Sequence, residues 1–442
     1  MVQAKAGIFV PELSGLEPIP ETQRHGSTAG VGWVWFSANM GLPGWYLGVL
    51  ALVLGLAPVP ALAAILIGNA IGSAALGALS TLGPATGSPS IPLTARVFGR
   101  RGNGLASAFN AISCLGWYGV NAVVGAQALA SLLHIPYLPA LVVIVLILTG
   151  VAWYGHDLVH ALEHRAAYLL LAVYAALAVR LIVVHPTALA SAAAHPGGVD
   201  AFLLVVTIIA SFVFSWAPYA GDYSRYLPAD TPRPAVFWST AMGAFLACVF
   251  LQVLGLAAAR AVGAAGTPAG ILSAAMGPLA VPALAAVVLG TITANVLNVY
   301  TGALSTLSLG LRLPRTWMAV LFGVGGGAVS WIAAAHFSRN FEDYLLLISY
   351  WVAPWVGVVL AWSLVHPRLP VEGPTVRRRL LGAFVLGVVA TVPFMNQALY
   401  VGPVAKWLGG ADLGYWVAFA VAFGLGWNSL RASRSSGDTP TP

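Results

Sequence analysis

The stretch that decides the fold is Ser211–Pro228, which reads S-F-V-F-S-W-A-P-Y-A-G-D-Y-S-R-Y-L-P. It follows an apolar run. Pro218 in its middle has no amide hydrogen to donate, so the carbonyl one turn earlier loses its partner. Within a bilayer an open backbone group is costly unless protein or a water-filled cavity satisfies it. We therefore predict that a membrane helix breaks here, beside Trp216, to line a binding cavity. A tolerated proline kink is the alternative.

The composition places this break in a membrane protein. The chain of 442 residues has a mean hydropathy of +0.87, with 59% hydrophobic and 7% charged residues. These are too few charges to cover a soluble surface. We therefore predict an all-α polytopic membrane protein of about 12 transmembrane helices, each of the roughly 20 apolar residues that span a bilayer. The apolar windows are 30–54, 58–82, 104–131, 137–155, 165–184, 201–221, 236–260, 279–308, 317–335, 341–364, 380–399 and 412–428.

The positions of the basic residues indicate the orientation. When the N-terminus is placed in the cytoplasm, most of the 20 lysines and arginines fall on that side, which is the positive-inside bias. The exceptions are Arg180, Arg260, Arg339 and Lys406. Topology therefore explains the net charge of +7 better than a nucleic-acid partner does. We expect a monomeric, multi-pass protein of the plasma membrane, in contact with the lipid bilayer and with both termini in the cytoplasm.

A second interruption mirrors the first. The run G-W-V-W-F-S-A-N-M-G-L-P-G-W at 32–45 places Asn39, Gly41 and Pro43 near mid-membrane. Gly and Pro weaken a helix by about 1 to 3 kcal/mol per residue relative to Ala. The two breaks lie roughly 176 positions apart, and Asn121 and Asn298 repeat that spacing. Gly/Pro-interrupted segments at corresponding positions of two halves point to the central site of a transporter.

The helix count implies how the two halves are related. Five predicted helices precede the midpoint and five follow it, and an odd number per half forces the halves to be inverted. We therefore predict a five-plus-five inverted repeat in which helices 1 and 6 are discontinuous. The predicted segments are a cytoplasmic N-terminal segment (1–29), the first repeat with helices 1–5 (30–195), the second repeat with helices 6–10 (196–365), a cytoplasmic link with helices 11 and 12 (366–428), and a disordered cytoplasmic tail (429–442).

Aromatic and amide side chains on four of these helices are expected to meet in one cavity. Trp117 and Asn121 are four residues apart and so share a face of helix 3, as Asn295 shares a face of helix 8 with Thr291. Indoles can stack on a flat ligand, and amides both donate and accept in one plane. Interhelical hydrogen bonds of the asparagines and interfacial positions of the tryptophans are the alternatives. The predicted substrate-binding residues are Trp117, Asn121, Trp216, Asn295, Ser37, Asn39, Ser215, Tyr219 and Asn298.

Asp222 is the acid nearest to the predicted cavity, three residues before Arg225. Intramembrane ionisable groups are candidates for function, so Asp222 could carry a coupling proton. We favour the alternative, a local ion pair with Arg225 that closes a gate at the cytoplasmic end of helix 6. The sequence predicts no cofactor and shows no metal-binding spacing.

Several of these segments resemble the signatures of the nucleobase–cation symporter family, first class, which is the purine/cytosine permease and hydantoin transporter group. S-W-A-P-Y-A-G-D-Y-S-R-Y-L-P resembles its helix 6, G-W-Y-G-V-N its helix 3 and A-N-V-L-N-V-Y its helix 8. The resemblance covers roughly residues 20–400. It implies a LeuT-type inverted repeat in which Trp117 and Trp216 sandwich a base while Asn121 and Asn295 bond its edge.

The resemblance also implies that Na⁺ or H⁺ is the coupling ion. In sodium-coupled relatives the ion lies between the break of helix 1 and hydroxyl groups of helix 8. The adjacent Ser-Thr pair of those relatives is not evident, since Leu289 and Gly290 precede Thr291. The identity of the ion therefore stays open. The implied cation-binding residues are Ser37, Met40, Thr291 and Thr293.

Together these features predict a secondary active transporter that imports a nucleobase-like heterocycle with a cation by alternating access, with cytosine or a purine as substrate. A hydroxymethylpyrimidine precursor of thiamine, hydantoin and allantoin are alternative substrates. An amino-acid or quaternary-amine symporter of the same fold is a further alternative, although the paired asparagines favour a nucleobase. An enzyme would need clustered His, Asp or Glu at bilayer depth, so we predict that the protein is not one. A non-transporting membrane sensor would be recognised by a lack of uptake.

Overall fold

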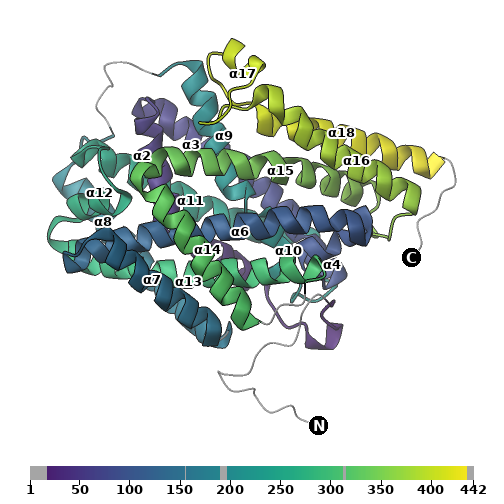
Figure 1. The fold of residues 1–442 in the computed structure, drawn as a ribbon, viewed down its shortest axis with the longest axis horizontal. Coiled ribbons are helices and arrows are strands. Elements are labelled where there is room, and N and C mark those ends of the chain that lie inside the picture. The colour runs from purple at the N-terminus through teal and green to yellow at the C-terminus, as the bar shows by residue number, and fades with distance from the viewer. Residues whose placement is uncertain (1–16, 155, 190–196, 312–314, 436–442) are drawn as a thin grey trace, which may run out of the picture.

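The computed structural model describes residues 17–154, 156–189, 197–311 and 315–435 (Figure 1). Within these ranges the chain is helical apart from short connections and one isolated bridge between Asn396 and Val401. The main helices are α1 (Thr28–Ala38), α2 (Leu42–Val53), α3 (Pro58–Ser80), α6 (Ala95–Leu133), α7 (Tyr137–Tyr154), α8 (His156–Val184), α9 (Val199–Phe214), α11 (Arg233–Val262), α13 (Ala280–Ser308), α14 (Arg315–Ala333), α15 (Phe337–Val365), α16 (Pro374–Thr391) and α18 (Gly414–Ser435). The all-α prediction is confirmed.

Short helices connect the long ones. They are η1 (Glu21–Gln23), α4 (Leu82–Thr86), α5 (Ser90–Leu93), η2 (Ala217–Tyr219), α10 (Ala220–Ser224), α12 (Pro268–Met276), η3 (Gly277–Leu279), η4 (Ala334–His336), η5 (Val392–Phe394) and α17 (Pro403–Trp407). Among the described residues, six helical stretches are long and apolar enough to cross a membrane, or seven when the bent pair α1 and α2 is taken as one span. Every predicted window overlaps a described helix, but the count of twelve crossings stays a prediction.

The first helix breaks where the sequence predicts. Helix α1 ends at Ala38 and α2 begins at Leu42, and their axes meet at 55°. Gly41 lies between them in an extended conformation (φ −101°, ψ 155°). Pro43 occupies the first turn of α2, where its missing amide hydrogen leaves no hydrogen bond unmade. The chain therefore changes direction at Asn39–Gly41 and exposes backbone carbonyls of α1 to its neighbours.

The break in the second half is milder than predicted. Helix α9 ends at Phe214, and the chain tightens into the 3₁₀ turn η2 before α10. Trp216 (φ −79°, ψ −12°) and Tyr219 (φ −98°, ψ −8°) keep right-handed dihedral angles. Because a 3₁₀ turn needs no donor from its second residue, Pro218 fits there without unwinding the helix. The predicted position is correct, but the unwound stretch that we expected is a 3₁₀ turn.

The helices pack as three groups. Helices α1, α2, α3, α9 and α11 pack against one another, as do α6, α7, α13 and α14, with α8 against α13. Helices α15, α16 and α18 form the third group, seen along the upper side of Figure 1. Two glycines allow the backbones of α2 and α11 to touch. A Cβ on Gly48 would lie 1.8 Å from the carbonyl oxygen of Gln252, and a Cβ on Gly255 would lie 2.0 Å from the carbonyl oxygen of Trp45. Such small-residue contacts are typical of membrane helices.

Two predicted boundaries near the C-terminal end are wrong. The predicted helix 380–399 is α16, which begins at Pro374 and is followed by the turn η5 at Pro393. Proline is favoured in the first helical turn, so the charged link from α15 is shorter than expected and spans 366–373. The predicted tail begins at 429, yet α18 continues to Ser435 because no Gly or Pro interrupts 429–435. Residues 436–442 lie outside the described ranges.

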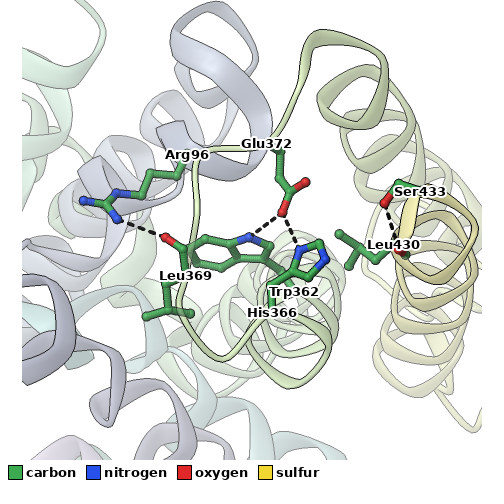
Figure 2. A network of polar contacts seen from close by, with 7 residues as sticks. All are labelled: Arg96, Trp362, His366, Leu369, Glu372, Leu430 and Ser433. Carbon is green, nitrogen blue, oxygen red and sulfur yellow. Dashed lines mark hydrogen bonds and ion pairs between the residues drawn. The ribbon is translucent and has the colours of Figure 1, made fainter. Parts of the chain in front are cut away.

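The link 366–373 is held by a buried polar network (Figure 2). One Glu372 oxygen, Oε1, accepts from Trp362 Nε1 at 2.9 Å and lies 2.7 Å from His366 Nδ1. Arg96 at the start of α6 donates to the Leu369 carbonyl at 2.9 Å, and its own carbonyl accepts from the Glu372 amide at 3.0 Å. The network therefore ties the end of α15 to the start of α6.

Candidate functional site

Two indole rings lie parallel at the centre of the molecule. Trp117 of α6 and Trp216, between α9 and η2, have ring centroids 6.5 Å apart and planes inclined by 9°. A flat ring held between two indoles needs about 7 Å between their planes, twice the carbon–carbon contact distance. The pair therefore lies slightly inside the spacing of an aromatic sandwich. Both side chains are buried, with 7% and 9% of their surface exposed.

Other aromatic rings fix the orientation of this pair. Each approaches an indole with its edge, the geometry that aromatic quadrupoles prefer. The sequence prediction missed the two from α15, since nothing in its many aromatic residues distinguishes those that face the site. The edge contacts to Trp117 come from Phe212 (5.6 Å), Phe341 (6.2 Å) and Tyr344 (5.5 Å), and those to Trp216 from Trp35 (5.9 Å) and Tyr219 (5.2 Å).

Asn39, at the break of the first helix, holds the indole of Trp216. Its Oδ1 accepts from Trp216 Nε1 at 3.1 Å and from the Cys248 thiol at 3.3 Å. Its Nδ2 donates to the Trp35 carbonyl at 2.8 Å. The side chain is 1% exposed. The structure therefore places this predicted ligand contact behind the indole, where it positions the ring.

A chain of hydrogen bonds joins α13 to the other half of the site. Asn295 donates from Nδ2 to the Tyr118 carbonyl at 3.2 Å, and its Oδ1 accepts from Asn298 Nδ2 at 3.1 Å. Asn298 Oδ1 accepts from the Tyr219 hydroxyl at 3.2 Å, and that hydroxyl lies 3.1 Å from the Cys114 thiol. These bonds fix the amide plane of Asn295 and leave it one N–H and one oxygen lone pair for a ligand.

Asn121 and Ser215 are each bonded to their own helix. Asn121 Nδ2 donates to the Trp117 carbonyl at 3.0 Å, so its oxygen is left to accept from a ligand. Ser215 Oγ donates to the Phe212 carbonyl at 2.6 Å, as serines in membrane helices commonly do. Asn121 thus offers an acceptor one turn from Trp117.

A small cavity lies between the break of the first helix and α13. Ser37, Met40 and Gly41 line one side, and Gly290 and Thr293 line the other. Its volume of about 20 Å³ is enough for one water molecule or one ion. No charged side chain is among the lining residues.

The two hydroxyl groups at this cavity are held by their own helices. Ser37 Oγ donates to the Val34 carbonyl at 3.0 Å and Thr293 Oγ1 to the Gly290 carbonyl at 2.9 Å. Because each hydroxyl hydrogen is used, the oxygens remain as electron-pair donors. Of the predicted cation-binding residues, the structure brings Ser37, Met40 and Thr293 together. Thr291 packs instead against α6, where a Cβ on Gly125 would lie 2.6 Å from its Cγ2.

Asp222 and Arg225 are both buried at the end of α10, with 4% and 0% exposure. The Asp222 carboxylate accepts from the Ser90 amide at 3.2 Å and from the Thr301 hydroxyl at 3.1 Å. It therefore connects α10 to α5 and α13, partners that the sequence prediction missed. The Arg225 guanidinium donates to the hydroxyls of two tyrosines, Tyr226 at 3.3 Å and Tyr300 at 3.2 Å.

Comparison with known proteins identifies the family. Residues 18–418 match the family described as "Permease for cytosine/purines, uracil, thiamine, allantoin". The chain belongs to this family. The permease is 28% identical to YxlA of Bacillus subtilis, classed as a purine-cytosine permease, over 93% of this chain and 94% of that one. It is also 28% identical to the purine-cytosine permease fcyB of Emericella nidulans, over 95% and 88% of the two chains.

Solved structures show the same fold. The inward-facing conformation of Mhp1 matches with a TM-score of 0.75 at 16% identity, over 97% of this permease and 96% of Mhp1. A closed conformation of Mhp1, a nucleobase-cation-symport-1 family transporter with bromovinylhydantoin bound, matches with the same TM-score over 96% of each chain. The predicted family resemblance is confirmed. The protein is a multi-pass membrane transporter rather than an enzyme.

Proposed function

We propose that this permease imports a neutral, nucleobase-like heterocycle, cytosine or a purine, between Trp117 and Trp216. The parallel indole pair carries the proposal, since two indoles inclined by only 9°, with centroids 6.5 Å apart, can stack on both faces of one flat ring once they separate to admit it. Base–aromatic stacking contributes about 1–3 kcal/mol per base. The two relatives that are named as purine-cytosine permeases support this class of substrate.

The edge of the base would be read by Asn121 and Asn295. Asn121 offers its oxygen to a ring or exocyclic N–H, because its amide group is held by the bond from Nδ2 to the Trp117 carbonyl. Asn295 offers its remaining N–H to a ring nitrogen or carbonyl, because its bonds to Tyr118 and Asn298 fix the plane of its amide. A cytosine or adenine edge carries one acceptor next to one donor and matches this pair. Neither amide carries a positive charge to neutralise a carboxylate, which disfavours an amino-acid substrate.

A coupling cation, Na⁺ or H⁺, would act at the cavity between the first helix and α13. The hydroxyls of Ser37 and Thr293 would supply oxygen ligands, the type that hard cations prefer, and among the described residues that line the cavity none is acidic, as a divalent cation would need. The cavity joins the α1–α2 group to the α6–α13 group. An ion there would favour one arrangement of the two groups, and linkage makes its coupling to the base reciprocal. No other cofactor is proposed.

Alternating access would then be a movement of one helix group against the other. Asp222, bonded to Ser90 and Thr301, would hold the cytoplasmic side closed. The proposed orientation has both termini in the cytoplasm, which the distribution of basic residues supports. The protein would act as a monomer in the plasma membrane. The predicted inverted repeat is part of this proposal, supported by the hydrogen bond between the equivalent breaks at Asn39 and Trp216.

The proposal is tested by uptake of radiolabelled cytosine and adenine into proteoliposomes. Trp117→Ala and Asn295→Ala should each abolish uptake while the purified protein stays folded and monodisperse, although loss of the buried Trp117 ring lowers the melting temperature. Trp238→Ala, a change of an indole that is 61% exposed, is the matched control and should leave uptake intact. Wild-type uptake by both site variants would remove these residues from the binding site.

Hydantoin, allantoin and the hydroxymethylpyrimidine precursor of thiamine remain alternative substrates. Each is a small flat ring with donors and acceptors on its edge, and Mhp1 has been solved with a hydantoin bound. Thermal-shift measurements with these compounds and with nucleobases, each with and without Na⁺, would rank them, since stabilisation grows with ligand concentration over its dissociation constant. A greater shift with hydantoin than with any base would overturn the nucleobase proposal.

A further inference from the structure

A second, larger cavity lies among helix ends that are opposite α4 and α10 in Figure 1. It is formed where the end of α6 meets the starts of α7 and α12 and the end of α14. Its volume is about 460 Å³, within the roughly 300–1,000 Å³ of small-molecule sites. Three alanines on α6 and η4 leave the space open. We name it the outer pocket. It is at the extracellular surface in the proposed orientation.

The polar groups of the outer pocket include an amide with an unused hydrogen-bond acceptor. Gln127 is 6% exposed, and its buried Oε1 has no hydrogen-bond partner. An unsatisfied buried oxygen is costly, so a ligand that pairs with this amide would be bound favourably. Thr267 Oγ1 accepts from the Gly270 amide at 3.1 Å as the cap of α12, which leaves its hydroxyl hydrogen for a ligand.

The walls of the outer pocket are aromatic and uncharged. Tyr137 and Trp331 supply rings, and the Tyr137 hydroxyl donates to the Ser330 carbonyl at 3.2 Å, which fixes its ring. No Asp, Glu, Lys, Arg or His is among the lining residues. An amide, hydroxyls and aromatic faces without charge are the chemistry found around Trp117 and Asn121. The outer pocket therefore suits a neutral, flat solute with N–H and carbonyl groups on its edge.

We propose that the outer pocket is a second, weaker binding site for the transported heterocycle, occupied before it reaches the indole pair. This proposal rests on the proposed function. Gln127 follows Asn121 by six residues on α6, about 9 Å along a helix with a rise of 1.5 Å per residue. At 3.6 residues per turn Gln127 also lies about 120° around α6 from Asn121, so the two sites are on different faces of the helix and both can be occupied. A site there would raise the local concentration of substrate at low external supply.

The experiment measures the stoichiometry of [³H]cytosine and [³H]adenine binding to the purified full-length protein, with uptake in parallel. We expect a tight and a weak class of site in the wild type. Asn295→Ala should remove the tight class alone. Gln127→Leu should remove the weak class alone and raise the KM of uptake by roughly 2- to 13-fold, the contribution of one neutral hydrogen bond. Ala334→Leu, which fills the pocket and keeps Gln127, should do the same.

Ile332 lies next to Trp331 in the sequence and is 74% exposed. Ile332→Ala is therefore the control and should retain both classes of binding site. A single class in the wild type that Asn295→Ala abolishes would overturn the outer pocket and leave the proposed function intact. A weak class that survives both Gln127→Leu and Ala334→Leu in folded protein would also overturn it. A wild type that binds and transports neither base would overturn the proposed function, and the outer pocket with it.

Discussion

The hydrogen bond from Trp216 Nε1 to Asn39 Oδ1, 3.1 Å long and buried, should set the affinity of the site by holding one indole in place. Asn39→Leu keeps the branching of the side chain at Cγ but leaves the indole N–H without an acceptor. A buried, unpaired donor costs about 1–3 kcal/mol. The indole must be brought back to its position before it can stack on the base, so this penalty is subtracted from the binding free energy. Since about 1.4 kcal/mol is a tenfold change in Kd, cytosine should bind roughly 5- to 160-fold more weakly.

Trp216→Phe tests the same bond from the other side. It keeps an aromatic face and removes the donor, so only the bond itself is lost, about 0.5–1.5 kcal/mol or roughly 2- to 13-fold in Kd. The double variant has no unpaired donor and should therefore bind more tightly than Asn39→Leu alone. Cys248→Ala, which removes the thiol that shares Asn39 Oδ1, is the control and should bind nearly as the wild type does.

The assay is a double-mutant cycle with Kd from [³H]cytosine binding, since only a cycle isolates the pairwise contribution. A coupling energy near zero, with the double variant weaker than either single one, would refute the role of this bond. The melting temperature of each variant separates lost affinity from lost folding.

Three further outcomes follow from the packing. Thr293→Ala should raise the cation concentration for half-maximal uptake by about tenfold or more, because Thr293 lines the small cavity. Thr291 does not line it, so Thr291→Ala should leave that concentration unchanged. Equal effects of the two variants when uptake is titrated with Na⁺ and with H⁺ would contradict this. Gly48→Leu should prevent recovery of a monodisperse protein by size-exclusion chromatography, because its Cβ would overlap the backbone of α11 at 1.8 Å, and a stable, active variant would disprove that contact. Glu372→Leu should lower the free energy of unfolding by roughly 2–6 kcal/mol, since it leaves two buried donors, Trp362 and His366, unpaired. The exposed Arg368→Ala is its control in thermal melts, and an equal melting temperature for both would count against the network.

Much of the candidate site could be predicted from local sequence. Gly41, Pro43 and Pro218 place the two breaks, because these residues act on the backbone wherever they occur. Helical spacing puts Trp117 and Asn121 on one face, and the repeat spacing pairs Asn39 with the break that contains Trp216. The boundary errors at α16 and α18 arose because hydropathy marks the apolar part of a helix, while its ends depend on caps and prolines.

The roles within the site could not be predicted in this way. Asn39 and Asn121 are alike in sequence, yet one bonds an indole and the other keeps its oxygen for a ligand. Thr291 and Thr293 are two residues apart on α13, and only the packing against Gly125 decides which of them faces the cavity. Ser90 and Thr301 reach Asp222 from 132 and 79 residues away, distances over which no sequence pattern extends.

The sequence by itself determined that the chain spans a membrane, where its helices break and which kind of transporter it resembles. These depend on composition, on proline and on short motifs, whose effects are local. The tertiary structure alone decided that two indoles lie parallel 6.5 Å apart and that one amide orients a ring while another is left free. It also decided that a glutamine with an unpaired oxygen lines an outer pocket. The physical reason is that hydrogen-bond partners and cavities arise between helices distant in the chain, and only packing brings those helices together.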